Sequence, residues 1–291
     1  MLYSTKADII SALGGLEKIT LEQLGTVYKE GDGEFGICFE YAVHDAVRAR
    51  DSTIYPIVED VLDSFCRIRG TSESILFGIE KNGSLNIVET AKNSLTDDAR
   101  VLVGKVGKPP KLKHRIATLE RAFRSVKHRD RLPNCISGLW KADLFLGSPS
   151  SDQWVGTTLK LNKEELEAAP GLRVGIYPSK TKEGPKQDSL KNMILCPMPY
   201  RGDFMVLFQA SFNIAKQLMH SRGEMPKPPA IIYEDDLSVA EWLSARRKFP
   251  VMGILEALHP LMQPGLIKAS DSKESIASSG IEAFAPIPLI L

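Results

Sequence analysis

Hydrophobic residues recur through much of the chain at the spacing of helices. The segment 35–50 carries apolar side chains about 3.6 residues apart, which predicts a buried helix. The same spacing predicts a helix over 53–68, an amphipathic helix over about 111–128, and another that begins after Gly202-Asp203. Shorter helices are predicted at 5–13, 20–29, 163–169, 238–247 and 250–262.

Apolar runs of strand length alternate with these helices. Two strands joined by a loop are predicted within Leu139–Asn162, and single strands within 171–179 and 192–200. The pair Asn82-Gly83 lies between two apolar runs, which predicts a β-hairpin. This order of elements predicts an α/β (α+β) fold with a mixed central sheet flanked by helices.

The chain divides into three predicted regions. Residues 1–33 are expected to form an N-terminal helical segment, and residues 34–235 a core with a basic helical insertion at about 91–133. Residues 236–291 are expected to hold C-terminal helices and a tail. With 291 residues, of which 43% are hydrophobic and 25% charged, the chain can bury a sizeable core.

Several classes of protein are not expected from this composition. No apolar run approaches the roughly 18 to 20 residues that cross a bilayer, and residues 1–15 do not resemble a signal peptide, so we expect a cytoplasmic protein with no membrane partner. The four cysteines lie far apart and the five histidines form no H-x-x-x-H pattern. Neither a disulfide framework nor a zinc site is therefore expected.

Positive charge is concentrated in one block of a chain whose net charge is only +1. Residues 101–131 hold ten Lys or Arg residues against two acids, Glu120 and Asp130. Such a block on a nearly neutral protein indicates a localised anionic partner, and we expect it to contact the DNA backbone. The residues predicted to bind DNA are Lys111, Lys113, Arg115, Arg121, Arg124 and Lys127. The alternative is an amphipathic helix whose charged face is only solvated.

Two opposite charges lie within predicted strands that are otherwise apolar. The segment reads LWKADLFLG, a loop, and then WVGTTLKLN, with Asp143 early in the first strand and Lys160 late in the second. Together with the helix and strand predicted to follow, it resembles the PD-(D/E)xK nuclease superfamily, whose fold is called restriction-endonuclease-like. Members of that family have an Asp at the start of one strand, (D/E)-x-K on the adjoining strand, and usually a Glu on a preceding helix. Asp143 and Lys160 match the Asp and the Lys, and Glu40 looks like the helical Glu.

The resemblance implies a metal-dependent DNA endonuclease that hydrolyses phosphodiester bonds. Asp143 and Glu40 would bind Mg²⁺ or Mn²⁺, while Lys160 would position the attacking water or neutralise the transition state. By resemblance, the setting would be bacterial restriction or phage defence, with double-stranded DNA as substrate. The protein would act as a homodimer or as a subunit of a multi-protein complex.

The chain departs from the family pattern at two positions. Ala142 replaces the proline, and Thr158 replaces the second acid, which normally binds metal. In some restriction enzymes of the family an acid on the following helix serves instead. Glu164, Glu165 or Glu167 could serve in that way, and Glu164 is our predicted metal ligand.

Two other functions remain open from the sequence. Thr158 favours a catalytically inactive nuclease-fold subunit that binds DNA or scaffolds a defence complex. The other alternative is an α/β protein with no nucleic-acid partner, in which Asp143 and Lys160 form a salt bridge without chemistry. Steep salt dependence of DNA binding would separate this last case from the other two.

Overall fold

The fold is described from a computed structural model of the chain. It describes residues 12–15, 17–29, 35–78, 85–104, 107–123, 136, 138–139, 141–225 and 234–258. The chain forms two compact units, which we call the sheet unit (33–212) and the helical unit (1–32 with 213–291). Residues 1–33 and 236–291 are predicted to be separate regions, whereas both ends of the chain contribute to the helical unit.

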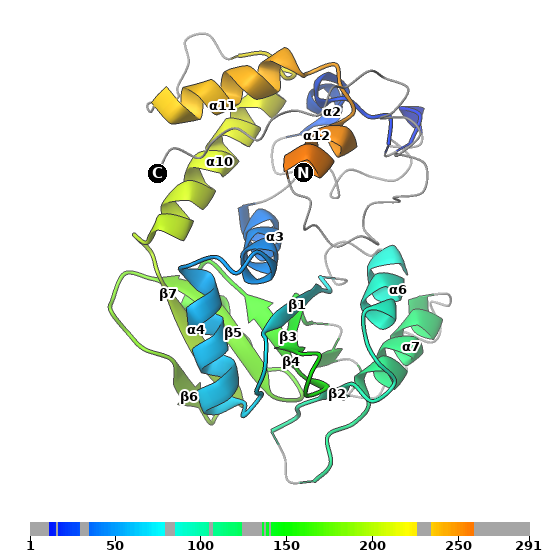
Figure 1. The fold of residues 1–291 in the computed structure, drawn as a ribbon, viewed down its shortest axis with the longest axis vertical. Helices are drawn as coiled ribbons and strands as arrows, with labels where there is room; N and C mark the ends of the chain where they lie inside the picture. Colours follow the sequence, from blue (N-terminus) through cyan, green and yellow to red (C-terminus); the bar gives the residue numbers. More distant parts are fainter. Residues whose placement is uncertain are drawn as a thin grey trace. The chain divides into compact units, whose positions relative to one another are not determined.

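The sheet unit is built on a mixed sheet of seven strands (Figure 1). The strand order is β1-β3-β4-β5-β7-β6, and β2 lies beside β4. Strands β4, β5 and β7 are parallel to one another, whereas β3 is antiparallel to β4, and β6 is antiparallel to β7. The strands are β1 (Glu73–Leu76), β2 (Arg100–Val101), β3 (Leu144–Ser148), β4 (Gln153–Leu159), β5 (Arg173–Ser179), β6 (Lys186–Asp188) and β7 (Met193–Pro199). This mixed α/β architecture confirms the predicted class, and β3, β4, β5 and β7 form within the predicted strand segments.

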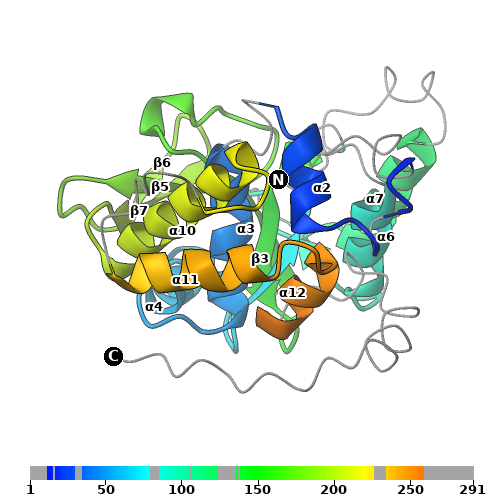
Figure 2. The same ribbon diagram turned by 90° about the horizontal axis from the view of Figure 1, so that it is seen from above.

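Helices cover one face of the sheet through the segment 35–65. The helix α3 (Phe35–Arg48) packs on β1 and also reaches β4, while α4 (Ile54–Asp60) and the π-helical turn η2 (Val61–Phe65) pack on β7. Figures 1 and 2 show α4 on one side of β5 and β7. Every residue of β3 is buried. Burial at every position requires cover on both faces, which explains why these strands read as continuous apolar runs.

Two further helices pack on each other beside β1 and β2: α6 (Leu85–Asn93) and α7 (Leu112–Phe123). Ile87, Val88 and Ala91 of α6 are buried. The predicted hairpin around Asn82-Gly83 is therefore wrong, because the segment after the turn signal is a helix. Apolar residues on successive turns pack on α7, and tertiary packing overrides a local turn preference. The Asn82-Gly83 pair itself lies outside the described residues.

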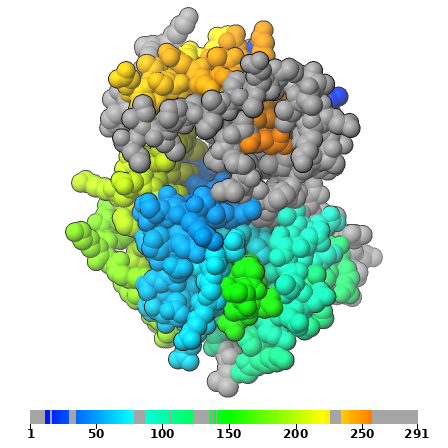
Figure 3. Space-filling view, viewed as in Figure 1, coloured from blue at the N-terminus to red at the C-terminus, as the bar shows by residue number. Residues whose placement is uncertain are grey.

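Figure 3 shows how these segments share one surface of the sheet unit. The part containing α3 and α4 and the part containing α6 and α7 lie on either side of a small area contributed by the region of β3 and β4.

Other differences from the sequence interpretation are local. The helix predicted over 163–169 is only a 3-10 turn, η3 (Lys163–Glu165), which Asn162 caps by accepting a hydrogen bond from the Glu164 backbone. Strands β2 and β6 were not predicted, because two and three residues are too few to show alternation. Within the described part of the chain, none of the helices has the length and apolar character that a membrane span requires.

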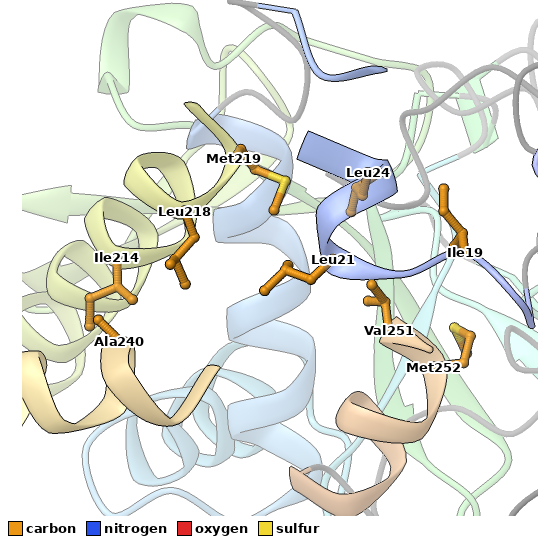
Figure 4. Close-up of a cluster of buried hydrophobic side chains, with 9 residues drawn as sticks. All are labelled: Ile19, Leu21, Leu24, Ile214, Leu218, Met219, Ala240, Val251 and Met252. Atoms are coloured by element: carbon orange, nitrogen blue, oxygen red, sulfur yellow. The ribbon is translucent and has the colours of Figure 1, made fainter. Parts of the chain in front are cut away.

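The helical unit is assembled from α2 (Leu21–Val27), the second half of α10 (Asp203–His220), α11 (Glu234–Ala245) and α12 (Val251–Leu258). Thr20 and Gln23 form a reciprocal capping box that begins α2, as the two side chains satisfy each other's backbone N–H groups. Figure 4 shows the apolar cluster that these elements share. Its buried members are Ile19, Leu21, Leu24, Ile214, Leu218, Met219, Ala240, Val251 and Met252.

Candidate functional site

Asp143 lies at the edge of the sheet where β3 begins and β4 ends. Its backbone N–H donates to the carbonyl oxygen of Thr157 at 2.9 Å, and its carboxylate Oδ2 accepts from the backbone N–H of Leu159 at 2.8 Å. The carboxylate thus takes the place of a backbone acceptor between the two strands. Asp143 is 5% exposed, and this hydrogen bond fixes its position directly beside the residue that precedes Lys160.

Lys160 directly follows Leu159, the last residue of β4. Its backbone N–H donates to the carbonyl oxygen of Ile176 on β5 at 3.1 Å. The side chain is partly exposed, and among the described residues it forms no ion pair within 4.0 Å. The salt bridge between Asp143 and Lys160, which was the structural alternative, is therefore not formed. The ammonium group of Lys160 can instead meet a ligand at this edge.

Arg173 is a buried cation that the sequence interpretation did not single out. It is 2% exposed and pairs in register with Gly156 on β4, whose missing side chain leaves the space that the guanidinium occupies. Its Nη2 donates to the carbonyl oxygen of Gly138. Burial lowers the pKa of Arg173 to about 10, and the negative charge of Asp143 acts in the opposite direction. Arg173 therefore stays protonated at neutral pH and supplies positive charge to the surroundings of Asp143.

A signal for Arg173 was present in the sequence. It is the one charged residue within the apolar run LRVGIY of a predicted strand. A charge inside a strand that is buried on both faces needs a specific partner, since an isolated buried charge is costly.

Glu40 is buried in α3, one helical turn before His44. His44 Nδ1 lies 2.9 Å from Ser74 Oγ, which ties α3 to the face of the sheet that carries Ser74. Through the register of β1, β3 and β4, Thr157 points to this same face, so Thr158 alternates to the opposite one. The helix of Glu40 and the side chain of Thr158 thus lie on different faces. The role of Glu40 at the Asp143 edge stays a prediction.

The three acids after β4 are exposed, and the role of Glu164 as a metal ligand stays a prediction. Glu164 and Glu165 are exposed on η3, and Glu167 pairs with Lys141 at 3.6 Å. In the described ranges, no group of three or more His, Cys, Asp or Glu residues could hold a metal ion. With a single carboxylate from the strands, this edge would suit an ion of the Mg²⁺ kind, which is often held by one or two carboxylates, waters and substrate phosphates. Asp143 would be its ligand from the strands.

The basic segment carries charge that is already partly balanced. Lys111 pairs with Asp98 at 3.2 Å, and Lys113 with Asp97 at 2.8 Å. The hydrogen bond from Lys113 and its positive charge hold the pKa of Asp97 below the usual range. Two of the lysines predicted to contact DNA, Lys111 and Lys113, therefore already form ion pairs within the protein.

The other predicted contacts of this segment differ in position. Arg121 is exposed, with its Nε donating to the carbonyl oxygen of Ala117 at 3.3 Å, and Arg115 is partly exposed. Arg124 and Lys127 lie outside the described residues. Among the described members of this set, Arg115 and Arg121 form no ion pair with described residues, which leaves their charges available to a phosphate.

No family model, curated protein or solved structure matches the chain. The candidate site is therefore defined by its own residues, above all by Asp143, Leu159 and Lys160.

Proposed function

We propose that the chain is a metal-dependent DNA endonuclease with a restriction-endonuclease-like core. Its phosphodiesterase centre would be the edge that holds Asp143 and Lys160. The observation that carries the proposal is the hydrogen bond from Leu159 N–H to the Asp143 carboxylate, directly before a lysine that has no ion pair among the described residues. An Asp at the start of one strand and a Lys at the end of the adjoining strand match two positions of the family pattern, whereas Thr158 departs from it.

The two side chains would have different tasks. Asp143 is a hard oxygen ligand in a fixed position, and a bound Mg²⁺ would supply charge neutralisation at the phosphate and an acidified water. Lys160 would place its ammonium against the scissile phosphate and stabilise the negative charge that develops there. Removing one such preorganised group typically lowers the rate about 10²- to 10³-fold.

Plasmid cleavage in Mg²⁺ or Mn²⁺ tests the proposal. We expect nicking by the unmodified protein, and loss of nicking in Asp143→Asn and in Lys160→Ala. Asp143→Asn keeps an oxygen that can accept from Leu159 N–H, so the variant separates the loss of charge from the loss of the strand contact. Lys141→Ala is the matched control, because Lys141 is an exposed lysine two residues before Asp143 whose partner is Glu167.

Equal activity of the Asp143→Asn variant and the unmodified protein would exclude this site. Thermal unfolding of each variant shows whether a loss of activity reflects unfolding instead of chemistry.

A second function is supported by different observations. Thr158 replaces a metal-binding acid, and the positive charge of Arg173 already acts on Asp143 as a cation would. These features favour a catalytically inactive nuclease fold that binds DNA or scaffolds a complex. This alternative predicts DNA binding with steep salt dependence, no cleavage in either metal, and no change of affinity on adding a chelator.

A further inference from the structure

The sheet unit has an open groove of about 1070 Å³ at the ends of β5 and β7. The loop after β5, the turn after β7 and one side of α4 line it. Because β4, β5 and β7 are parallel, their carboxyl ends share one edge of the sheet, and Lys160 lies at that edge. In open α/β sheets, ligands commonly bind in crevices outside the carboxyl ends of the strands.

The groove carries positive charge that the described residues do not balance. Lys180, Lys182 and Arg201 are exposed and line it, and within the described part of the chain none of them forms an ion pair. Lys180 Nζ lies 5.4 Å from the centre of the Tyr200 ring, a cation–π contact that holds the ammonium beside the groove.

The acids of the groove are fewer, and one of them is already engaged. Glu183 accepts hydrogen bonds from Lys186 Nζ at 2.5 Å and from Thr181 Oγ1 at 2.7 Å, and these bonds lower its pKa to about 2. Asp60 is the other acid, and it accepts from Ser64 Oγ at 2.8 Å. The groove therefore presents three cations without a described counter-ion against one acid that is not ion-paired.

Hydroxyl groups complete the lining. Ser179 Oγ and Thr181 Oγ1 lie 2.9 Å apart at the start of the loop, next to Lys180 and Lys182. Lysine, arginine and hydroxyl groups together are the side chains that contact phosphate oxygens in protein–DNA complexes. The turn after β7 adds Arg201, whose planar guanidinium suits a phosphate.

We propose that this groove, and not the basic segment at 111–127, is the principal surface that binds the phosphate backbone of DNA. The inference rests on the proposed nucleic-acid function and places the strand beside the Asp143–Lys160 edge. By strand geometry, Lys160 and Ser179 are separated by one strand spacing and a few residues, roughly 10 Å. The groove and Lys160 thus lie near the same edge of the sheet.

Binding measurements on the full chain test this assignment. The probe is a fluorescently labelled duplex of about 30 base pairs, with the corresponding single strand as a second probe, at several salt concentrations without divalent metal. We expect the combined variant Lys180→Ser, Lys182→Ser and Arg201→Ser to lower the affinity about tenfold or more. The slope of log affinity against log salt should fall by about 3, one for each lost phosphate contact.

A charge-preserving variant serves as the matched control. Lys180→Arg, Lys182→Arg and Arg201→Lys together keep the three charges, and we expect near-native affinity and salt slope. Lys248→Ser removes an exposed lysine that belongs to the helical unit and is expected to change neither quantity.

The outcomes separate this inference from the proposed function. Unchanged affinity and salt slope in the triple Ser variant would show that the groove is not the DNA-binding surface, whether or not the protein cleaves DNA. Reduced binding in that variant, with no cleavage by the unmodified protein, would support the groove as the DNA-binding surface. It would also contradict the proposed endonuclease activity. If the unmodified protein bound neither probe at 50 mM salt, both would be wrong.

Discussion

Arg173 on β5 fills the space beside Gly156 on β4 that any larger side chain at position 156 would need. The glycine is therefore part of a cation site: its lack of a Cβ lets a guanidinium lie inside the sheet. Asp143 is the acid whose charge acts on that guanidinium. The surroundings of the candidate active site thus contain a permanent positive charge built into the core.

The first prediction concerns this buried charge. Arg173→Met should lower the free energy of unfolding by about 3 kcal/mol, because removing one member of a buried charge pair leaves the other uncompensated. Asp143→Asn should be destabilising too, but the double variant should lose less than the sum of the two. Urea unfolding of the four proteins gives the coupling free energy, expected at about 1–3 kcal/mol. Strict additivity would show that the two charges do not stabilise each other.

The second prediction concerns pH and His44. Burial, with a smaller effect of Arg48, lowers the pKa of His44 to about 3. Since the pKa in the unfolded chain is about 6.5, the neutral side chain favours folding fully above pH 6.5, and this contribution is lost as the pH falls from 6.5 towards 3. The free energy of unfolding should therefore be about 2 kcal/mol lower at pH 5 than at pH 7.

His44→Asn checks this, because the amide keeps a polar group near Ser74 but does not titrate. Chemical unfolding at pH 7 and at pH 5 should show a smaller drop in stability for the variant than for the unmodified protein. Equal drops would assign the acid sensitivity to other groups.

The third prediction introduces at position 158 the acid that the PD-(D/E)xK pattern has there. Thr158→Asp places a second carboxylate in the segment of β4 that Asp143 contacts. Without metal, repulsion between the two carboxylates should lower the midpoint of thermal unfolding. With Mg²⁺ at millimolar concentration the midpoint should recover, because an ion that binds only the folded protein stabilises it.

The matched control for this prediction is Thr158→Asn, which adds similar bulk without charge. A Mg²⁺ response that is equal in the Asn and Asp variants would mean that residue 158 does not reach a metal site.

The fourth prediction concerns the two lysines that pair with acids near α7. Asp97→Asn with Asp98→Asn releases Lys113 and Lys111 from their partners. If the basic segment contacts DNA at all, affinity should rise and the salt slope should steepen by about 2. A fluorescence anisotropy titration measures both, and an unchanged slope would show that this face is only solvated.

The sequence predicted the central elements and missed the features that depend on packing. Helix α3 and the strands β3 to β5 formed where expected. Apolar residues recur in these segments with a clear helical or strand spacing, so the sequence shows the period directly. The segment 85–93 did not form a strand, because its apolar residues bury against α7, a partner distant in sequence. Contacts between segments that are distant in the sequence cannot be predicted from the local hydrophobic pattern.

The site could be predicted only in part for a similar reason. Asp143 and Lys160 were found because charges between apolar residues are unusual and matched a known pattern. The groove was not predicted, since Arg201 lies about 20 residues after Lys180 and Lys182 and joins them only when β5 and β7 pair. Arg173 was overlooked because a charged residue is usually expected to be solvated, although its place in the apolar run LRVGIY indicated burial.

The helical unit has a consequence for synthesis on the ribosome. Its cluster joins α2, near the start of the chain, to α12, more than 200 residues later. At the usual rate of about 5–20 residues per second, α2 waits roughly 10 to 45 s for its last partner, while the whole sheet unit emerges in between. Residues 33–212 are therefore free to fold first, and Leu21 and Leu24 stay exposed until the C-terminal helices arrive. A chaperone that binds short apolar segments would have its longest opportunity at α2.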